Sequence, residues 1–136
     1  MSQENVEIVR ESLTVTAYLA AIRDRDFRPL LVHFDPEVLV NQPPELPDAK
    51  SYRGHDGVVE ALGDWPSQWD EFRADILEVI DGGETVVQLT RQYMRARDME
   101  IEQDVAFVYT FKDRTIIGWD AYFTFDEALE AAGLRE

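Results

Sequence analysis

The apolar positions in the first third of the chain predict two helices and one strand. Val6, Leu13 and Ala17 share one stripe at helical spacing, which predicts a long amphipathic helix from about residue 5 to 24. A short second helix is predicted over 27–34, and "DP" ends it, because the residue before a proline disfavours helical conformation. The segment "EVLVNQP" then alternates loosely and stops at a group of prolines, which indicates a strand followed by a loop.

A motif bounded by glycines opens the next predicted helix. In "SYRGHDGVVEAL", Gly54 is the expected helix N-cap, and Asp56 falls in the first turn, where a carboxylate favours the helix dipole. The apolar stripe of this helix continues to Trp65 and Trp69, and Pro66 predicts a kink or break between them.

The second half of the chain predicts a four-stranded antiparallel meander and a closing helix. The strands are expected near 72–80, 85–95, 100–111 and 115–125, because the short segments "DGGE", "ARDM" and "KDR" between them have the character of hairpin turns. The ending "DEALEAAGLRE" predicts a short helix with Asp126 as its N-cap and Gly133 near its C-terminus.

Two of the predicted strands are apolar on both faces. The third strand has Phe107 and Tyr109 on one face and Ala106 and Val108 on the other. An antiparallel sheet normally leaves one face to water, so we expect helices on one side and a second copy of the chain on the other. The sequence therefore predicts a homodimer through the outer face of the sheet.

The composition is that of an ordinary globular protein, and we expect a single domain over residues 1–136. The chain is 45% hydrophobic and 30% charged, and it has no cysteine, which excludes disulfides and cysteine-ligated metals. A formal net charge of −15 would repel nucleic acid and anionic membrane surfaces. The N-terminus shows no signal-peptide pattern, and no stretch approaches the ~20 apolar residues of a membrane span. We expect a cytoplasmic protein.

Histidine is sparse as well. His33 and His55 are the two histidines, and they have no partner at a metal-ligand spacing, so no metal site and no cofactor are expected.

Several motifs resemble one family over most of the chain. They are "YRGHDGV", the two tryptophans of the following helix, "EVIDGGETVV" and "IIGWDAYFTFDEALEAAGL". Together with the order of predicted elements, they resemble the SnoaL-like family of the nuclear-transport-factor-2-like superfamily, which includes ketosteroid isomerase, limonene epoxide hydrolase and scytalone dehydratase. The resemblance implies an α+β fold of the cystatin-like kind, a cone-shaped curved antiparallel sheet wrapped around N-terminal helices. It also implies that His55 is a surface or capping residue.

The resemblance to ketosteroid isomerase can be followed residue by residue. That enzyme uses a tyrosine, a carboxylate base and a protonated aspartate. An ungapped match over the first helices places Tyr18 at the tyrosine and Gln42 at the base, and the aspartate falls near Phe107. A glutamine cannot accept and return a proton near neutral pH, so we expect no steroid isomerisation by that mechanism.

The last strand resembles that of limonene epoxide hydrolase in "GWDAYF". The catalytic aspartate of that enzyme falls on Ala121, and the neighbouring Asp120 is expected to point to the opposite face, because strand side chains alternate. A register shift of one residue would bring Asp120 inside, which keeps it as a catalytic candidate.

Arg91 in "TVVQLTRQYM" stands out from the residues alone. It shares a strand face with Val87, Leu89 and Tyr93, and a guanidinium among apolar side chains needs a partner or an anion. The interpretation that we prefer is a structural ion pair. The functional alternative is that Arg91 and Tyr18 stabilise an oxyanion or hold a polar group of a ligand.

Two functions remain open at this stage. One is an isomerase, cyclase or hydrolase that acts on a small, hydrophobic, polyketide- or steroid-like molecule, with Tyr18, Arg91 and Asp120 as catalytic candidates and no identified base. The alternative is a non-catalytic binder of a small hydrophobic molecule with an acid or carbonyl group. The candidate ligand-binding residues are Gln42, Tyr93, Gln103, Phe107, Tyr109, Trp119 and Phe123. The aromatic members of this set are equally explained as core residues.

Overall fold

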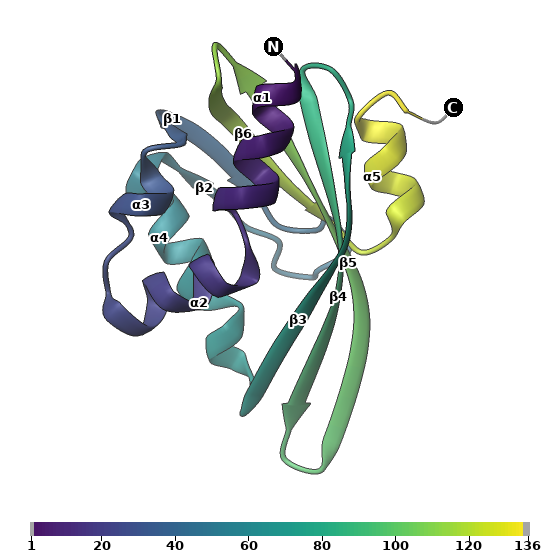
Figure 1. Ribbon diagram of the computed structural model, residues 1–136. Coiled ribbons are helices and arrows are strands. Elements are labelled where there is room, and N and C mark those ends of the chain that lie inside the picture. The colour runs from purple at the N-terminus through teal and green to yellow at the C-terminus, as the bar shows by residue number, and fades with distance from the viewer. Residues whose placement is uncertain (1, 135–136) are drawn as a thin grey trace.

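The computed structural model describes residues 2–134 and is built on one curved, open six-stranded sheet (Figure 1). The strand order is β2-β1-β6-β5-β4-β3. The bounds are Phe34–Asn41 for β1, Ser51–Arg53 for β2, Glu71–Asp81 for β3, Thr85–Ala96 for β4, Met99–Lys112 for β5 and Thr115–Tyr122 for β6. The predicted α+β class and the antiparallel meander from β3 to β6 are confirmed.

The sheet extends beyond the meander through β1 and β2. β1 lies parallel to β6, with Val40 paired to Trp119 and Asn41 paired to Asp120. β2 pairs antiparallel with β1 and was missed in the sequence, because three residues carry too little alternation to indicate a strand.

Five α-helices and two short turns of other helix types complete the described residues. The helices are Ser2–Glu7 (α1), Val15–Asp24 (α2), Arg28–Leu31 (α3), Gly54–Asp64 (α4) and Phe125–Ala131 (α5), with a π-helical segment at Ile8–Ser12 and a 3₁₀ turn at Pro66–Gln68.

The prediction of one unbroken helix over residues 5–24 is wrong. Thr14 is extended, and its Oγ1 accepts a hydrogen bond of 3.0 Å from the backbone N–H of Ala17, which caps α2. A threonine hydroxyl competes well for the first free N–H groups of a helix, so a new helix begins there. The apolar stripe continues across the break, since Leu13 and Ala17 both face the protein interior, and this continuity hid the break.

The glycine motif is a backbone device at the start of α4. Gly54 has a φ of +76°, and a Cβ there would lie 3.0 Å from the backbone oxygen of Pro36, so glycine suits the position. The N-cap position itself belongs to Arg53, not to Gly54 as predicted. His55 donates from Nε2 to the backbone oxygen of Phe34 over 2.8 Å and thereby ties the helix start to β1.

The two faces of the sheet are covered by different parts of the chain. α1 to α4 lie on the concave side, and α5 lies on the opposite side (Figure 1). There Val87 and Val108 pack with Ala128 of α5, so the chain itself covers part of the second apolar face. A homodimer through the rest of that face stays a prediction.

The start of α5 differs from the predicted one. Its N-cap is Thr124, whose Oγ1 accepts a hydrogen bond of 3.2 Å from the backbone N–H of Glu127, so Asp126 lies inside the helix. Phe125, which the sequence placed at the end of the last strand, is the first residue of the helix.

Candidate functional site

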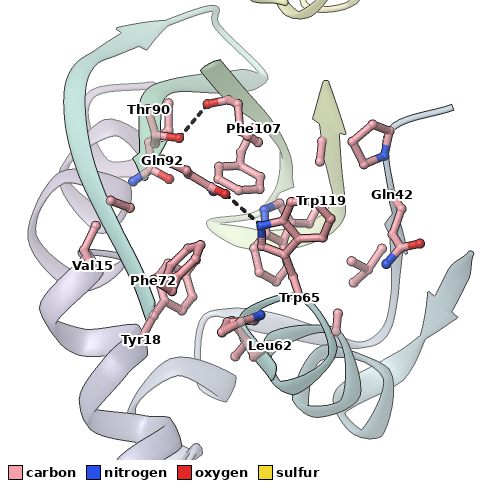
Figure 2. A pocket seen from close by; sticks show the side chains of 18 of the residues that line it. Val15, Tyr18, Gln42, Leu62, Trp65, Phe72, Thr90, Gln92, Phe107 and Trp119 are labelled. Atoms are coloured by element: carbon pink, nitrogen blue, oxygen red, sulfur yellow. Dashed lines mark hydrogen bonds between the residues drawn. The ribbon is translucent and has the colours of Figure 1, made fainter. Parts of the chain in front are cut away.

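A cavity of about 150 Å³ lies between the concave face of the sheet and the helices α2 and α4 (Figure 2). Its walls are mainly apolar. The polar amide and hydroxyl side chains in the lining are Tyr18, Asn41, Gln42, Gln88, Thr90 and Gln92. The larger aromatic side chains are Trp65, Phe72, Phe107, Trp119 and Phe123. Within residues 2–134, the lining contains no aspartate, glutamate, lysine, arginine or histidine.

Tyr18 of α2 begins a directed chain of hydrogen bonds. Its hydroxyl oxygen lies 2.8 Å from that of Tyr109, which donates to Oε1 of Gln88 over 3.2 Å. Nε2 of Gln88 in turn donates to the backbone oxygen of Leu13 over 2.9 Å. Because a phenol has a single O–H, Tyr18 is the donor to Tyr109 in this arrangement.

The two phenols of this hydrogen-bond chain, Tyr18 and Tyr109, are neutral groups. Burial raises the pKa of Tyr18, and burial also raises the pKa of Tyr109 well above its ordinary value. Neither side chain therefore supplies a base at neutral pH. The proton of Tyr18 is already donated within the protein, so the sequence resemblance that singled out this tyrosine does not make it a free donor here.

Trp119 lies at the centre of an aromatic cluster. Its ring stacks on Tyr18 at 5.7 Å between centroids and on Tyr109 at 5.8 Å, and it packs at a tilt against Phe107 and Phe34. The side chain is 6% exposed, and its Nε1 is sealed without a hydrogen-bond partner among residues 2–134. Such a buried, unpaired N–H costs about 1–3 kcal/mol, which the surrounding ring contacts offset.

Gln92 of β4 and Trp65, which follows α4, form a second polar pair in the cavity wall. Nε1 of Trp65 donates to Oε1 of Gln92 over 2.8 Å (Figure 2). Gln92 is 4% exposed, and the ring of Trp65 packs near Phe123 at 6.4 Å between centroids. The amide is thus held in one orientation by an indole, which can only donate.

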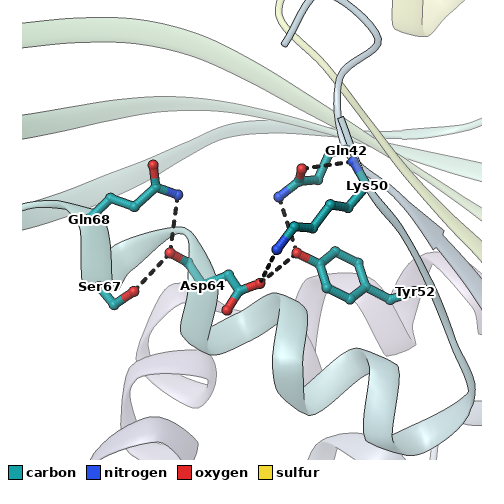
Figure 3. Close-up of polar contacts among 6 residues, drawn as sticks. All are labelled: Gln42, Lys50, Tyr52, Asp64, Ser67 and Gln68. Carbon is teal, nitrogen blue, oxygen red and sulfur yellow. Dashed lines mark hydrogen bonds and ion pairs between the residues drawn. The ribbon is translucent and has the colours of Figure 1, made fainter. Parts of the chain in front are cut away.

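Gln42 lines the cavity, and its amide is engaged at both its oxygen and its nitrogen (Figure 3). Its Oε1 accepts from the backbone N–H of Lys50 over 3.0 Å, and its Nε2 donates to the hydroxyl of Tyr52 over 3.3 Å. Tyr52 donates to Oδ2 of Asp64 over 2.7 Å, and Nζ of Lys50 lies 3.8 Å from the same oxygen. The predicted ligand-binding amide therefore fastens the loop 43–50 to the end of α4.

Asp120 lies beside the cavity wall and not in it. It accepts a hydrogen bond of 2.6 Å from Nδ2 of Asn41, whose Oδ1 accepts from Ser51 over 2.6 Å. The next residue, Ala121, does line the cavity, which is the alternation that the sequence indicated. The register shift that would have brought the carboxylate of Asp120 inside is absent from β6 at this point, because Val108 pairs with Asp120 in an unbroken ladder.

Arg91 and Tyr93 lie on the face of β4 that points away from the cavity. Nε of Arg91 is 2.9 Å from Oδ1 of Asp104 and 3.7 Å from Oε1 of Glu102. This is the ion pair that we preferred in the sequence. The ring of Tyr93 is covered by the guanidinium of Arg73 at 4.3 Å. Neither predicted residue is brought to the cavity.

The remaining predicted residues fall in three places. Phe107, Trp119 and Phe123 line the cavity. Tyr109 is fully buried behind Tyr18 and reaches the lining through their shared hydrogen bond. Gln103 donates to the backbone oxygens of Asp104 and Phe123 at 2.8 and 3.3 Å, so it positions the aromatic wall from the side.

Gln88, Thr90 and Gln92 carry the polar part of the β4 wall and were not predicted from the sequence. The available signal was their spacing: polar residues recur at every second position, between apolar residues that face the other way. The unusual charge of Arg91 had instead drawn the functional alternative to the opposite face of this strand. The structure places the buried amides inside and the charge outside.

Metal-ligand clusters and membrane-crossing helices can be assessed for residues 2–134. Residues 2–134 contain no cluster of three or more histidine, cysteine, aspartate or glutamate side chains that could hold a metal ion. No helix in this part of the chain is both long and apolar enough to cross a membrane.

The comparisons with known proteins agree with this architecture. The model of the SnoaL-like domain matches residues 15–119. No curated protein matches the chain in sequence. A protein of unknown function from Burkholderia pseudomallei, described as similar to nuclear transport factor 2, is 24% identical with a TM-score of 0.70, and the match covers 93% of this chain and 95% of that chain.

Two further solved structures are similar and contain small molecules. TerC, co-crystallized with polyporic acid, is 22% identical with a TM-score of 0.67, covering 96% of this chain and 98% of that chain. A protein with a ketosteroid isomerase-like fold from Catenulispora acidiphila, in complex with trimethylamine, is 14% identical with a TM-score of 0.62, covering 88% and 92%.

Proposed function

The chain belongs to the SnoaL-like domain family, and from this premise we propose that its cavity binds a small, neutral, mainly apolar molecule without catalysing a proton transfer. The observation that carries the proposal is the lining, which holds apolar, aromatic, amide and hydroxyl groups and no charged side chain among the described residues. A carboxylate or ammonium group moved into such a wall would lose its hydration without gaining a counter-ion. The alternative of an acidic ligand is therefore disfavoured.

The size of the cavity limits the ligand further. Its volume is about 150 Å³. An apolar cavity of roughly this volume accommodates one benzene-sized ring. We therefore favour a ligand with a single ring over the polycyclic molecules that the family resemblance suggested.

The chemistry of the lining supports binding over catalysis. General acid–base catalysis needs a titratable group whose pKa lies near the working pH. Tyr18 is the titratable side chain in the described lining, and burial raises its pKa further from neutrality. Arg91 and Asp120, the other catalytic candidates, are not in the lining: Arg91 contacts Asp104, and Asp120 accepts a hydrogen bond from Asn41.

The two structural neighbours with bound small molecules support a ligand-binding role for the fold. One was co-crystallized with polyporic acid and the other is in complex with trimethylamine. Their identities to this chain are 22% and 14%, so the likeness concerns the fold and not the ligand.

Isothermal titration calorimetry with three molecules of matched shape tests the proposal. Ethylbenzene and acetophenone are neutral, and benzoate carries a charge on a group of similar size. We expect the two neutral molecules to bind and benzoate to bind at least tenfold more weakly, because no cation meets its carboxylate. Equal or tighter binding of benzoate would contradict a neutral ligand.

A cavity-filling variant locates the binding. Ala121 lines the cavity, and Ala121→Leu would occupy part of the space and weaken the binding of both neutral molecules. Ala131→Leu is the matched control, because Ala131 is exposed on α5, on the other side of the sheet. An equal loss of affinity in both variants would place the binding elsewhere.

A further inference from the structure

The polar groups of the cavity differ in how far the protein already satisfies them. The amides of Gln42, Asn41 and Gln88 are each engaged at both ends, through oxygen and nitrogen. The hydroxyl of Thr90 donates to the backbone oxygen of Val105 over 2.6 Å, and that of Tyr18 donates to Tyr109. Each of these amide nitrogens therefore already donates to an acceptor within the protein, and each hydroxyl has donated its single proton.

Gln92 is different, because the protein uses only one end of its amide. Oε1 accepts from Nε1 of Trp65, and the hydrogen bonds within residues 2–134 leave Nε2 without an acceptor. Nε1 of Trp119 is both sealed from solvent and unpaired, whereas Nε2 of Gln92 is unpaired but not sealed. Gln92 thus presents an open N–H₂ group from a side chain that is 96% buried in the cavity wall, 4% being exposed.

Trp65 fixes this arrangement. An indole N–H can donate but cannot accept, so the amide end that faces it at 2.8 Å must be the carbonyl oxygen. The opposite end is then the nitrogen. A free glutamine amide would turn between two orientations, whereas this pair presents donors to the cavity in advance of binding, which lowers the entropy cost of recognition.

We propose that Gln92, held in orientation by Trp65, donates a hydrogen bond to a carbonyl oxygen of the ligand, which makes the ligand class a small neutral ketone, aldehyde or ester with one ring. The inference rests on the proposed function, since it assigns the polar contact within the same cavity. A carbonyl oxygen accepts a hydrogen bond and brings no donor of its own, whereas an alcohol or amine would add a donor that needs another acceptor. Trp65 acts as a positioning residue, and Gln92 is the specificity-determining contact.

The physical reason for specificity is the cost of an unmade hydrogen bond. A hydrocarbon that fills the cavity displaces water from Nε2 of Gln92 and offers this nitrogen no hydrogen-bond acceptor. A ketone of the same shape restores the hydrogen bond. A net difference of one hydrogen bond corresponds to about a tenfold ratio of dissociation constants.

The test measures that ratio with acetophenone and ethylbenzene, which differ by a carbonyl in place of a methylene. Calorimetric titrations of the wild-type chain should give about tenfold tighter binding of acetophenone. Gln92→Leu should bring the ratio close to one, by weakening acetophenone and not ethylbenzene. Trp65→Phe should lower the ratio in part, because the amide keeps its donors and loses its fixed orientation.

Two controls separate this effect from a change in folding. Gln68→Leu is the matched substitution at an exposed residue that follows Trp65 and does not line the cavity, and it should keep the wild-type ratio. If Gln92→Leu alone does not fold, because Nε1 of Trp65 loses its acceptor, the double variant Trp65→Phe with Gln92→Leu removes both polar groups and leaves none unpaired. Its ratio should also be close to one.

The outcomes distinguish this inference from the proposed function. If both molecules bind the wild-type chain with equal affinity, or if the Gln92 variants keep the tenfold ratio, the role of Gln92 is overturned while a neutral-ligand cavity stands. If neither molecule binds and Ala121→Leu changes nothing, the proposed function fails, and this inference fails with it. Loss of the ratio in the Gln92 variants, with Gln68→Leu unchanged, supports both.

Discussion

The phenol oxygens of Tyr18 and Tyr109 lie 2.8 Å apart, and the hydroxyl of Tyr109 continues the contact to Gln88. The chain of hydrogen bonds joins α2 to the centre of the sheet through β5 and β4 and ends on the backbone of Leu13, at the break before α2. It therefore fastens the first helices over the concave face. Its direction, from Tyr18 to Tyr109 to Gln88, makes the two phenols unequal.

Removing either hydroxyl should expose this inequality. Tyr18→Phe takes one donor from Tyr109 and should cost about 0.5–1.5 kcal/mol of unfolding free energy. Tyr109→Phe leaves Oε1 of Gln88 unpaired in a side chain that is 2% exposed, and should cost about 1–3 kcal/mol. Urea unfolding of the two variants and of the double variant measures both costs. A larger loss for Tyr18→Phe would contradict the direction of the chain.

Alkaline pH should unfold the protein through the same tyrosines. Burial raises the pKa values of Tyr18 and Tyr109, and burial together with Asp64 raises that of Tyr52. In the unfolded chain these phenols ionise near pH 10, so their contribution to stability is present below pH 10 and is lost as the pH rises beyond it.

Phenolate absorbance, followed through an alkaline titration, checks this expectation. The chain has five tyrosines, and all of them should titrate near pH 10 in strong denaturant. In the native protein part of the phenolate signal should appear only at higher pH, together with unfolding. Tyr18→Phe should reduce this late part. Superimposable titrations of native and denatured protein would show that the phenols are accessible in the folded state.

Gly54 and Gly63 form a matched pair within α4. Gly54 has a φ of +76° and lies close to Pro36, whereas a Cβ at Gly63 would meet no atom within 4 Å. Gly54→Ala should destabilise the protein by at least about 1–2 kcal/mol, the cost of a left-handed backbone for an alanine. Gly63→Ala should stabilise it by about 0.5–1 kcal/mol, because alanine favours the helix. Thermal unfolding of both variants gives the comparison. Equal effects would mean that α4 can begin without the left-handed turn.

The sequence predicted those elements whose signals are local. The turns "DGGE" and "KDR" defined the meander, and the glycine motif located the start of α4. The break at Thr14 could not be seen in the same way, because the apolar stripe runs through it and only the capping hydrogen bond to Ala17 shows where α2 begins. A local apolar pattern therefore indicates the type of an element, helix or strand, but does not show where that element is interrupted.

The candidate site was harder to predict than the fold because it depends on which face of β4 is concave. Alternate residues of this strand form two faces, one with Arg91 and one with Gln92, and the sequence of the strand allows either face to line a cavity. The choice is made by helices far away in the sequence, which pack over the Gln92 face, and by α5, which packs over Val87 and Leu89 on the other. No pattern within the strand contains that information.

Arg91 tests this assignment of faces most directly. Its guanidinium contacts Asp104 at 2.9 Å and Glu102 at 3.7 Å, on the side away from the cavity. Arg91→Leu should therefore leave the affinity for acetophenone unchanged within about twofold, which is well below the tenfold effect of one hydrogen bond. It should lower stability slightly, because two carboxylates lose their cation in a chain whose net charge is −15.

Salt supplies the internal control for Arg91→Leu. The stability difference between this variant and the wild-type chain should shrink as ionic strength rises, because the ion pair is partly exposed and its attraction is screened. Calorimetric titration with acetophenone and urea unfolding at low and high salt give the two readouts. If Arg91→Leu abolishes acetophenone binding while its unfolding curve stays that of the wild type, then Arg91 faces the ligand, and the cavity lies on the other side of β4. An unchanged affinity with a salt-sensitive loss of stability makes Arg91 a structural residue of the outer face.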